Sequence, residues 1–276
     1  MTKRSDNGAC WLIMLSAGIA LSVISALALT FSYVRYRQAR ELYSAARRAY
    51  VRSAVKISEQ PDASGSPDDA KAAGLTDEEL VGGIPWYELA SVDVNSLREE
   101  YPDTVGWIYF ENEDISYPVM YSGDNKKYLH TSYTGEHSSA GALFLDGGSQ
   151  TDLSDPYSII YGHNMRDLSM FGKLKYYRTD GEYYDSHRFF QIFDGEHIYR
   201  YKIFAYEVVK PSHPMYQACG SDPGDLDGLL EMLWSDSIEK TDVPVSASDH
   251  VITLSTCTSG GKERMTVSAV RVGEHE

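Results

Sequence analysis

The stretch HVITLSTCTSGGKERMTVSAV, His250 to Val270, decides the fold prediction. Two apolar runs, 250–256 and 264–270, are separated by a short polar segment that contains two adjacent glycines. Short apolar runs bounded by turn residues are typical of strands, and so brief a connection favours an antiparallel pair. The chain is therefore predicted to close with two neighbouring strands, which would bring Cys257 and Arg264 to the same end of one sheet.

From about Ile84 to this stretch the sequence also predicts mostly short strands, and it predicts few helices, all of them short. A sequence of many short strands with few helices favours a β-barrel or sandwich over a doubly wound sheet. Strands are predicted at 105–110, 115–120, 141–145, 157–162, 189–193 and 197–209, and helices at 94–101, 169–177 and 225–234. Asp194-Gly195 is a strong hairpin signal between two of these strands.

Length and composition limit the function classes. The 276 residues can bury one sizeable core, and a hydrophobic content of 42% excludes wholesale disorder. Three cysteines cannot form a disulfide framework. Residues 1–60 hold nine Lys/Arg against three Asp/Glu, whereas residues 61–276 hold 16 against 37. So acidic a domain is a poor candidate for nucleic-acid binding, because its field repels phosphates.

The amino-terminal segment predicts a membrane anchor. Residues 11–34 carry no charge over 24 positions, about 36 Å as a helix, which is enough to span a bilayer. A cleaved signal peptide is disfavoured by this length and by the lack of a small-residue exit. Residues 35–83 are predicted to form a juxtamembrane helix followed by a flexible linker at 58–74, and the globular domain is predicted to start near Ile84.

Cys257 is the candidate nucleophile, because it lies where an apolar strand ends. Taken alone, such a cysteine is more often a buried structural residue. Cys10 abuts the predicted membrane span, and Cys219 lies in a loop with no apolar strand before it. A disulfide between Cys219 and Cys257 is an alternative that would argue against catalysis.

His163 and Arg264 are the candidate partners of the cysteine. His163 directly follows an apolar strand and a glycine, and Arg264 starts a strand seven residues after Cys257. An imidazole can carry a proton, and a guanidinium offers rigid donors for an oxyanion. An arginine at a strand end is usually only a solvated side chain. Here Cys257, His163 and Arg264 are all expected at one end of a sheet, and together they predict a catalytic site.

TLSTC followed by Arg264, with YGHNMRDLSMFGKL about ninety residues earlier, resembles the class B sortases, membrane-anchored cysteine transpeptidases of Gram-positive bacteria. The resemblance extends from about Ile84 to the end of the chain and includes the anchor. It implies an eight-stranded β-barrel with a helix, here 225–234, between the sixth and seventh strands. It also implies that His163, Cys257 and Arg264 are the catalytic residues.

The same resemblance implies four substrate-binding residues: Asn125, Leu129, Tyr216 and Ser255. Two features depart from the family pattern. The segment between the cysteine and the arginine is shorter than in some members, and Thr258 follows the cysteine where an acidic residue can occur. Both departures concern the oxyanion side of the site and leave the reaction class unchanged.

The resemblance further implies the reaction and its partners. A class B sortase cleaves the carboxyl-terminal sorting signal of a secreted protein after a threonine, and passes the protein through a thioester to an amine of peptidoglycan or of a pilin. It needs no metal or cofactor. The catalytic domain, 84–276, would lie outside the cell and residues 1–10 in the cytoplasm. Six arginines follow the predicted span, however, and a count by the positive-inside rule gives the opposite orientation.

Two alternatives stay open at this point. A cysteine peptidase or peptidoglycan amidase would use the same residue types, although papain-like enzymes place the cysteine before the histidine in the chain, and here His163 precedes Cys257. A membrane-tethered β-domain that binds the cell wall without catalysis would show no reactivity at Cys257.

Overall fold

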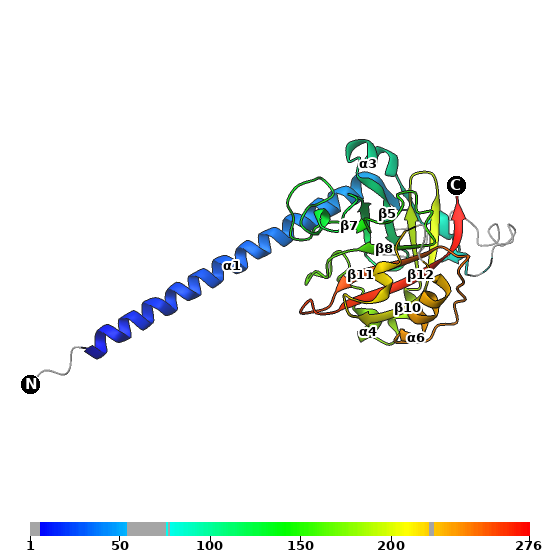
Figure 1. Ribbon diagram of the computed structural model, residues 1–276. Coiled ribbons are helices and arrows are strands. Elements are labelled where there is room, and N and C mark those ends of the chain that lie inside the picture. The colour runs from blue at the N-terminus through cyan, green and yellow to red at the C-terminus, as the bar shows by residue number, and fades with distance from the viewer. Residues whose placement is uncertain (1–5, 54–75, 77, 221–223) are drawn as a thin grey trace, which may run out of the picture.

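The computed structural model describes residues 6–53, 76, 78–220 and 224–276, with side chains from Trp11 onward. Figure 1 shows one long helix leading into a β-rich body. Eight strands form a closed barrel in the order β10-β12-β11-β8-β7-β6-β5-β9. They are β5 (Thr104–Phe110), β6 (Ser116–Met120), β7 (Leu143–Leu145), β8 (Tyr157–Tyr161), β9 (Phe189–Phe193), β10 (Ile198–Val209), β11 (Val251–Cys257) and β12 (Arg264–His275). The predicted eight-stranded barrel is confirmed.

The barrel mixes two kinds of strand pairing. β6 with β7 and β8 with β11 are parallel, and the other neighbours are antiparallel. β9 and β10 are joined at Asp194-Gly195, as predicted, and Gly195 has a φ of +101°, which glycine adopts without strain. Buried aromatic side chains fill the interior, among them Trp107, Phe110 and Phe190.

The predicted helix between the sixth and seventh barrel strands is present as α6 (Leu226–Asp236). Asp225 caps it by accepting a hydrogen bond of 2.9 Å from the Gly228 N–H. Its apolar face, including Leu229 and Leu233, packs on the outside of the barrel in a second apolar cluster with Phe204 of β10. Figure 1 shows this helix lying beside β10. The helix therefore covers the outer face of the strands that lead to Cys257 and Arg264.

The remaining helices are short. They are the 3-10 turns η1 (Trp86–Glu88), η2 (Lys127–Leu129) and η3 (Pro214–Gln217), and the α-helices α3 (Val94–Glu100), α4 (Tyr176–Thr179) and α5 (Tyr183–Ser186). The helix predicted over 169–177 is wrong for most of its length, since regular helix begins only at Tyr176. Its apolar residues are buried by successive turns, in which Leu168 and Met170 have positive φ. Helical spacing thus marked burial there and not a continuous helix.

The amino-terminal helix α1 (Asp6–Tyr50) is continuous over 45 residues. Every residue of its stretch 11–34 is exposed, and the stretch is long and apolar enough to cross a membrane. Its last turns pack on the barrel, where Tyr43 and Ala46 are buried. A start of the globular body at Ile84 therefore leaves out part of the core, because aromatic and small residues on one face of α1 have barrel partners.

Three short pairings complete the fold. After α1, β1 (Val51–Ser53) pairs with β4 (Ala90–Val92), and β2 (Leu80–Val81) pairs with β3 (Ile84–Pro85). The strand at β1 ties the end of α1 to the segment that enters the barrel. The predicted linker at 58–74 lies outside the described residues.

Candidate active site

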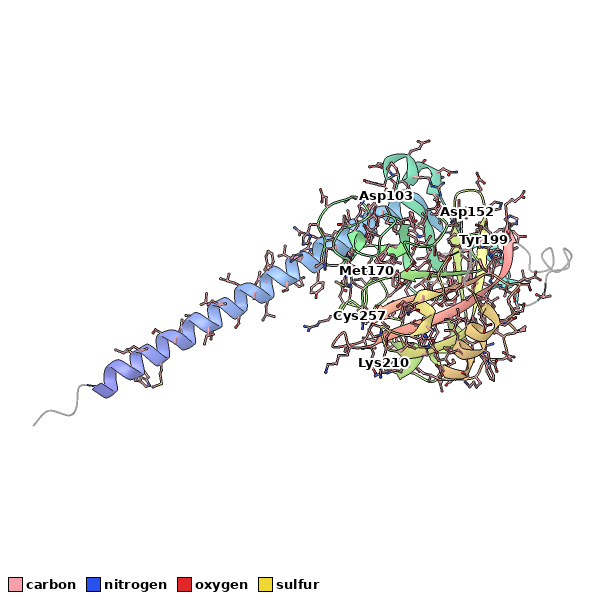
Figure 2. All side chains as sticks on the ribbon, in the orientation of Figure 1. Asp103, Asp152, Met170, Tyr199, Lys210 and Cys257 are labelled. Carbon is pink, nitrogen blue, oxygen red and sulfur yellow. The ribbon has the colours of Figure 1, made fainter. Side chains whose placement is uncertain are left out.

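Cys257 and Arg264 face each other across the last strand pair. Cys257 ends β11 and is directly opposite Arg264, the first residue of β12. Residues directly opposite in an antiparallel pair project to the same face. The rest of β11 is buried, whereas both of these residues are partly exposed. Figure 2 shows Cys257 at the edge of the barrel. The prediction that Cys257 and Arg264 lie at the same end of one sheet is therefore confirmed by the strand pairing.

The turn between the two strands is tight and holds the guanidinium. The Thr258 N–H donates to the Glu263 carbonyl at 3.0 Å, and Gly260 and Gly261 adopt φ of +100° and +71°. The Arg264 Nη1 donates to the carbonyls of Gly261 and Glu263, each at 3.1 Å. Arg264 thus lies over its own turn with donors on two backbone carbonyls.

His163 is brought beside Cys257 by the parallel pairing of β8 with β11. The register joins Ser255 to Tyr161, and the Gly162 N–H donates to the Ser255 carbonyl at 3.1 Å. Two residues further along each segment come His163 and Cys257. The backbone must pass close to neighbouring side chains here, because a Cβ on Gly162 would lie 2.3 Å from a methyl of Leu143. A larger residue before His163 would collide with Leu143 and Phe171 and displace this segment.

Asn164 locks the two segments together. Its Nδ2 donates to the Cys257 carbonyl at 2.8 Å, so the residue after the histidine is bonded to the candidate nucleophile. The ring of His163 is also fixed, because Nε2 lies 2.7 Å from the Leu129 carbonyl. A carbonyl can only accept, so Nε2 carries a proton in this contact. No pattern in the sequence singles out Asn164 beyond its position next to His163.

Ser255 and Tyr216 form one side of the site. Ser255 lies two residues before Cys257 on the same face of β11, and its Oγ is 2.9 Å from the Tyr216 hydroxyl. Burial raises the pKa of Tyr216, and the hydrogen bond with Ser255 and the charge of Arg264 oppose that increase. The Tyr216 ring also stacks on Tyr161, with 6.3 Å between centroids.

Asn125 and Leu129 lie on the other side. The Asn125 Nδ2 donates to an Asp146 carboxylate oxygen at 2.8 Å, and that same oxygen accepts from the Tyr161 hydroxyl at 2.8 Å. Leu129 is partly buried and holds His163 through its carbonyl. Contacts between neighbours therefore connect all seven residues selected from the sequence. Asp146 and Tyr161, which the sequence did not single out, join the Asn125 side to the Tyr216 side.

The other described cysteine has a different environment. Cys219 and Cys257 are both free thiols, so the alternative of a disulfide between them is not what the structure has. Burial raises the pKa of Cys219 well above its ordinary value, and the nearby carboxylates of Asp146 and Asp155 raise it further. A thiol held in its neutral form is a poor nucleophile.

The chain matches the Sortase domain family over residues 108–272, which contain His163, Cys257 and Arg264. The chain belongs to the sortase family. It is 34% identical to Sortase B of Listeria monocytogenes over 192 residues, or 69% of this chain and 76% of that relative. The sortase B of B. anthracis in complex with AAEK1 is similar in structure, with a TM-score of 0.62 and 25% identity over 87% of this chain and 99% of that one.

A second solved structure, the Staphylococcus aureus sortase B–substrate complex, matches with a TM-score of 0.59 and 26% identity, covering 65% of this chain and 84% of that one. The relatives are class B members, and their barrel is the one described above. The protein is therefore a class B sortase, and like the family it is a cysteine transpeptidase.

Proposed function

We propose that this class B sortase cleaves the carboxyl-terminal sorting signal of a secreted protein after a threonine and joins the protein to an amine of peptidoglycan or of a pilin. The observation that carries the proposal is the pairing of Cys257 with Arg264 beside a fixed His163. A thiol nucleophile, an oxyanion donor and a proton carrier then meet at one strand end.

In the first step the Cys257 thiolate attacks the carbonyl carbon of the threonine. The C–S bond forms as the carbonyl pair moves onto oxygen, and the oxyanion accepts hydrogen bonds from the Arg264 guanidinium. In the structure these donors are on the carbonyls of Gly261 and Glu263. Neutral carbonyls are weaker acceptors than an oxyanion, so the exchange favours the tetrahedral intermediate.

His163 moves the protons. Its Nε2–H donates to the Leu129 carbonyl, which orients the ring. The Nδ1–H gives its proton to the leaving amine as the C–N bond breaks, and a thioester remains on Cys257. An incoming amine attacks the thioester and loses a proton to Nδ1, and the C–S bond breaks to release the Cys257 thiolate. The thioester conserves the reactivity of the cleaved bond, so no nucleotide is needed.

We further propose that the sorting signal lies along Ser255 and Tyr216 on one side and Asn125 and Leu129 on the other. These residues flank Cys257 through the contacts described above. The Staphylococcus aureus relative was solved as a substrate complex, which supports a peptide-binding role for the corresponding end here.

The proposed topology is a single span at 11–34, with residues 1–10 in the cytoplasm and the domain 84–276 outside the cell. The arginines after the span oppose this orientation by charge count, but several have partners in the folded protein. Ion pairs join Arg37 to Glu41, Arg40 to Asp167 and Arg47 to Asp114. These arginines therefore have a structural use that is separate from topology.

The test is to trap the thioester. Incubation with a sorting-signal peptide should give a covalent adduct equal in mass to the peptide's amino-terminal portion, and hydroxylamine should release that portion as a hydroxamate. Cys257→Ala should abolish both products, whereas Cys219→Ala, the matched control, should keep both. Adduct formation by Cys257→Ala would refute the assignment. If the main product were the hydrolysed peptide, formed at the same rate with or without an added amine, the peptidase alternative would be favoured. If the wild type formed no adduct, a wall-binding domain would be favoured.

A further inference from the structure

The last turns of α1 contact the folded body at five positions along the helix. The pairs, in order along the helix, are Arg35 with His137, Arg40 with Asp167, Tyr43 with the Gly141 carbonyl, Arg47 with Asp114, and Tyr50 with Glu100. Tyr43 and Ala46 are 5% and 1% exposed, so the helix is packed as well as bonded. Contacts spread over about four turns of one helix fix both the height and the rotation of the barrel on it.

The lowest of these contacts lies next to the apolar stretch. Arg35 directly follows residue 34, and its Nη2 is 3.1 Å from the His137 Nε2. Arg40, six residues beyond the stretch and therefore about 9 Å along the helix axis, reaches Asp167 at 3.1 Å. Each headgroup layer of a bilayer is roughly 5–8 Å thick. With residues 11–34 as the span, the exposed loop that carries His137 would lie at headgroup level, and Asp167 would lie just above it.

The same side of the barrel carries the active site. Asp167 comes four residues after His163 in one loop, and the Met170 N–H of that loop donates to the Tyr117 hydroxyl at 3.1 Å. Tyr43 of α1 packs edge-on against Tyr117, with 5.4 Å between ring centroids. Figure 2 shows Cys257 on the side of the barrel from which α1 projects and Tyr199 on the opposite side.

The charge at this level suits a phospholipid surface. Arg37 and Arg40 have ion-pair partners but keep 67% and 64% of their side chains exposed. Residues 61–276 hold 16 basic against 37 acidic side chains, so anionic lipids would repel the barrel itself. Arginines just outside a span attract lipid phosphates and offset this repulsion.

We propose that residues 35–40 of α1 and the loop 131–138, together called the collar, rest on phospholipid headgroups and hold the active site at a fixed small height above the bilayer. The enzyme then acts best on a bond that lies close to the membrane span of its substrate. The proposal rests on the topology proposed above. Lipid headgroups are the partner, and α1 is the rigid spacer that sets the height.

The first test changes the height. Eleven residues of a helix-forming Glu/Ala/Lys sequence, inserted between Val34 and Arg35 of the full chain in vesicles, raise the barrel by about 16 Å and turn it by about three full turns. Cleavage of a vesicle-anchored substrate, with its cleavage site a few residues from its span, should fall at least tenfold. Cleavage of a soluble sorting-signal peptide should stay within about twofold.

A flexible insertion is the matched control. Eleven Gly/Ser residues at the same place let the barrel return to the surface, so cleavage of the anchored substrate should stay within about threefold of the wild type. If the rigid insertion and the wild type cleaved the anchored substrate at equal rates, the proposal that α1 is a spacer that sets the height would be wrong. Inactivity of the unmodified chain on the soluble peptide would refute the proposed function instead, so the two failures can be told apart.

The second test measures the contact itself. Glu136→Cys on the collar and Glu196→Cys in the β9–β10 hairpin at the far end each receive a fluorophore, in a full chain carrying Cys10→Ala, Cys219→Ala and Cys257→Ala. Lipids spin-labelled at the headgroup should quench the first label several-fold more than the second. Equal quenching of the two labels would overturn the collar.

Discussion

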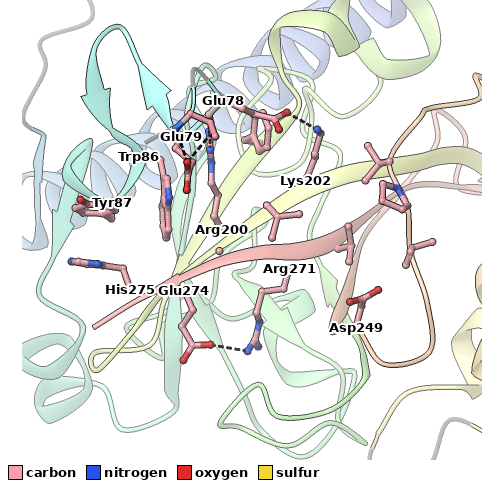
Figure 3. A pocket seen from close by; sticks show the side chains of 18 of the residues that line it. Glu78, Glu79, Trp86, Tyr87, Arg200, Lys202, Asp249, Arg271, Glu274 and His275 are labelled. Atoms are coloured by element: carbon pink, nitrogen blue, oxygen red, sulfur yellow. Dashed lines mark hydrogen bonds and ion pairs between the residues drawn. The ribbon is translucent and has the colours of Figure 1, made fainter. Parts of the chain in front are cut away.

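The two ends of the barrel both carry arginines, but these arginines are satisfied in different ways. At the far end, where a hollow of about 730 Å³ is lined by Glu78, Arg200 and the end of β12, Arg200 is buried (Figure 3). It donates to both carboxylate oxygens of Glu111, at 2.8 and 2.7 Å, and to the Glu78 carbonyl at 2.7 Å. At the near end, where Cys257 lies, Arg264 is partly exposed, and among the described residues its side chain donates to two carbonyls of its own turn.

The difference separates a structural charge from an available one. The guanidinium of Arg200 is neutralised by a carboxylate that is itself buried, so its binding capacity is used within the fold. Arg264 has no salt-bridge partner in the described parts of the chain, and it stands opposite Cys257. Of these two arginines, Arg264 is therefore the one that can respond to charge developing on a substrate. Predictions that affect the two ends differently test this comparison.

The largest effect is expected from Arg264→Lys. An ammonium keeps the charge but lacks the planar fork of donors, and loss of an oxyanion donor typically costs on the order of 10²–10³ in rate. We expect kcat/KM on a soluble sorting-signal peptide to fall by about that factor, with little change in thermal stability. Arg271→Lys, the same change at the other end of β12, should stay within about threefold. If Arg264→Lys behaved like Arg271→Lys, the two ends would not differ in the way described.

The next effect concerns stability at the far end. Glu111→Gln leaves the Arg200 charge buried without its partner, which typically costs about 3–5 kcal/mol. Denaturant unfolding should show this loss, while kcat of the folded protein at low temperature stays unchanged. Asp185→Asn breaks the exposed pair with Arg188 and should cost less than about 1 kcal/mol. A large fall in kcat of folded Glu111→Gln would show that the far end also serves the reaction.

Local sequence patterns were enough to predict most of the barrel. Strands of five or more residues appear as apolar runs, and the six residues between Cys257 and Arg264 leave little choice but a direct pairing. His163 was selected because a strand and a glycine precede it. These features depend on neighbours in the chain, which a single sequence displays.

Contacts between distant segments were out of reach. The Leu129 carbonyl that orients His163 is a backbone group 34 residues away, and every residue has such a group. Docking of α1 depends on Tyr43 meeting a carbonyl 98 residues later, so the sequence placed the domain start at residue 84. Glu111 and Arg200 are 89 residues apart, and neither has a pattern that marks it as half of a buried pair.

The smallest effect is expected on stability at the near end and concerns Glu207. Glu207 is a buried carboxyl of the near end, and Glu111 is its counterpart at the far end. Glu207 is paired in register with Thr266, which is paired with Ser255, and its Oε2 has no hydrogen-bond partner among the described residues. Burial raises its pKa to about 8, with a further increase from Asp236, against opposing effects of Thr266 and Lys240. The far-end carboxylate of Glu111 has an arginine partner, whereas Glu207 has no such partner in the described part of the chain.

The sign of the resulting pH dependence follows from linkage. Above its ordinary pKa of about 4.5 the unfolded chain has lost the Glu207 proton, whereas the folded protein keeps it up to about pH 8, so stability falls as pH rises through this window. Relative to wild type, Glu207→Gln should gain about 2 kcal/mol of unfolding free energy between pH 6 and pH 8. Denaturant unfolding at both pH values measures the gain. Glu231→Gln, on the exposed side of α6, is the control and should follow the wild type at both pH values. If the unfolding free energies of Glu207→Gln and wild type changed equally with pH, Glu207 would be ionised in the folded protein. Glu207 and Glu111 would then not differ in the way described.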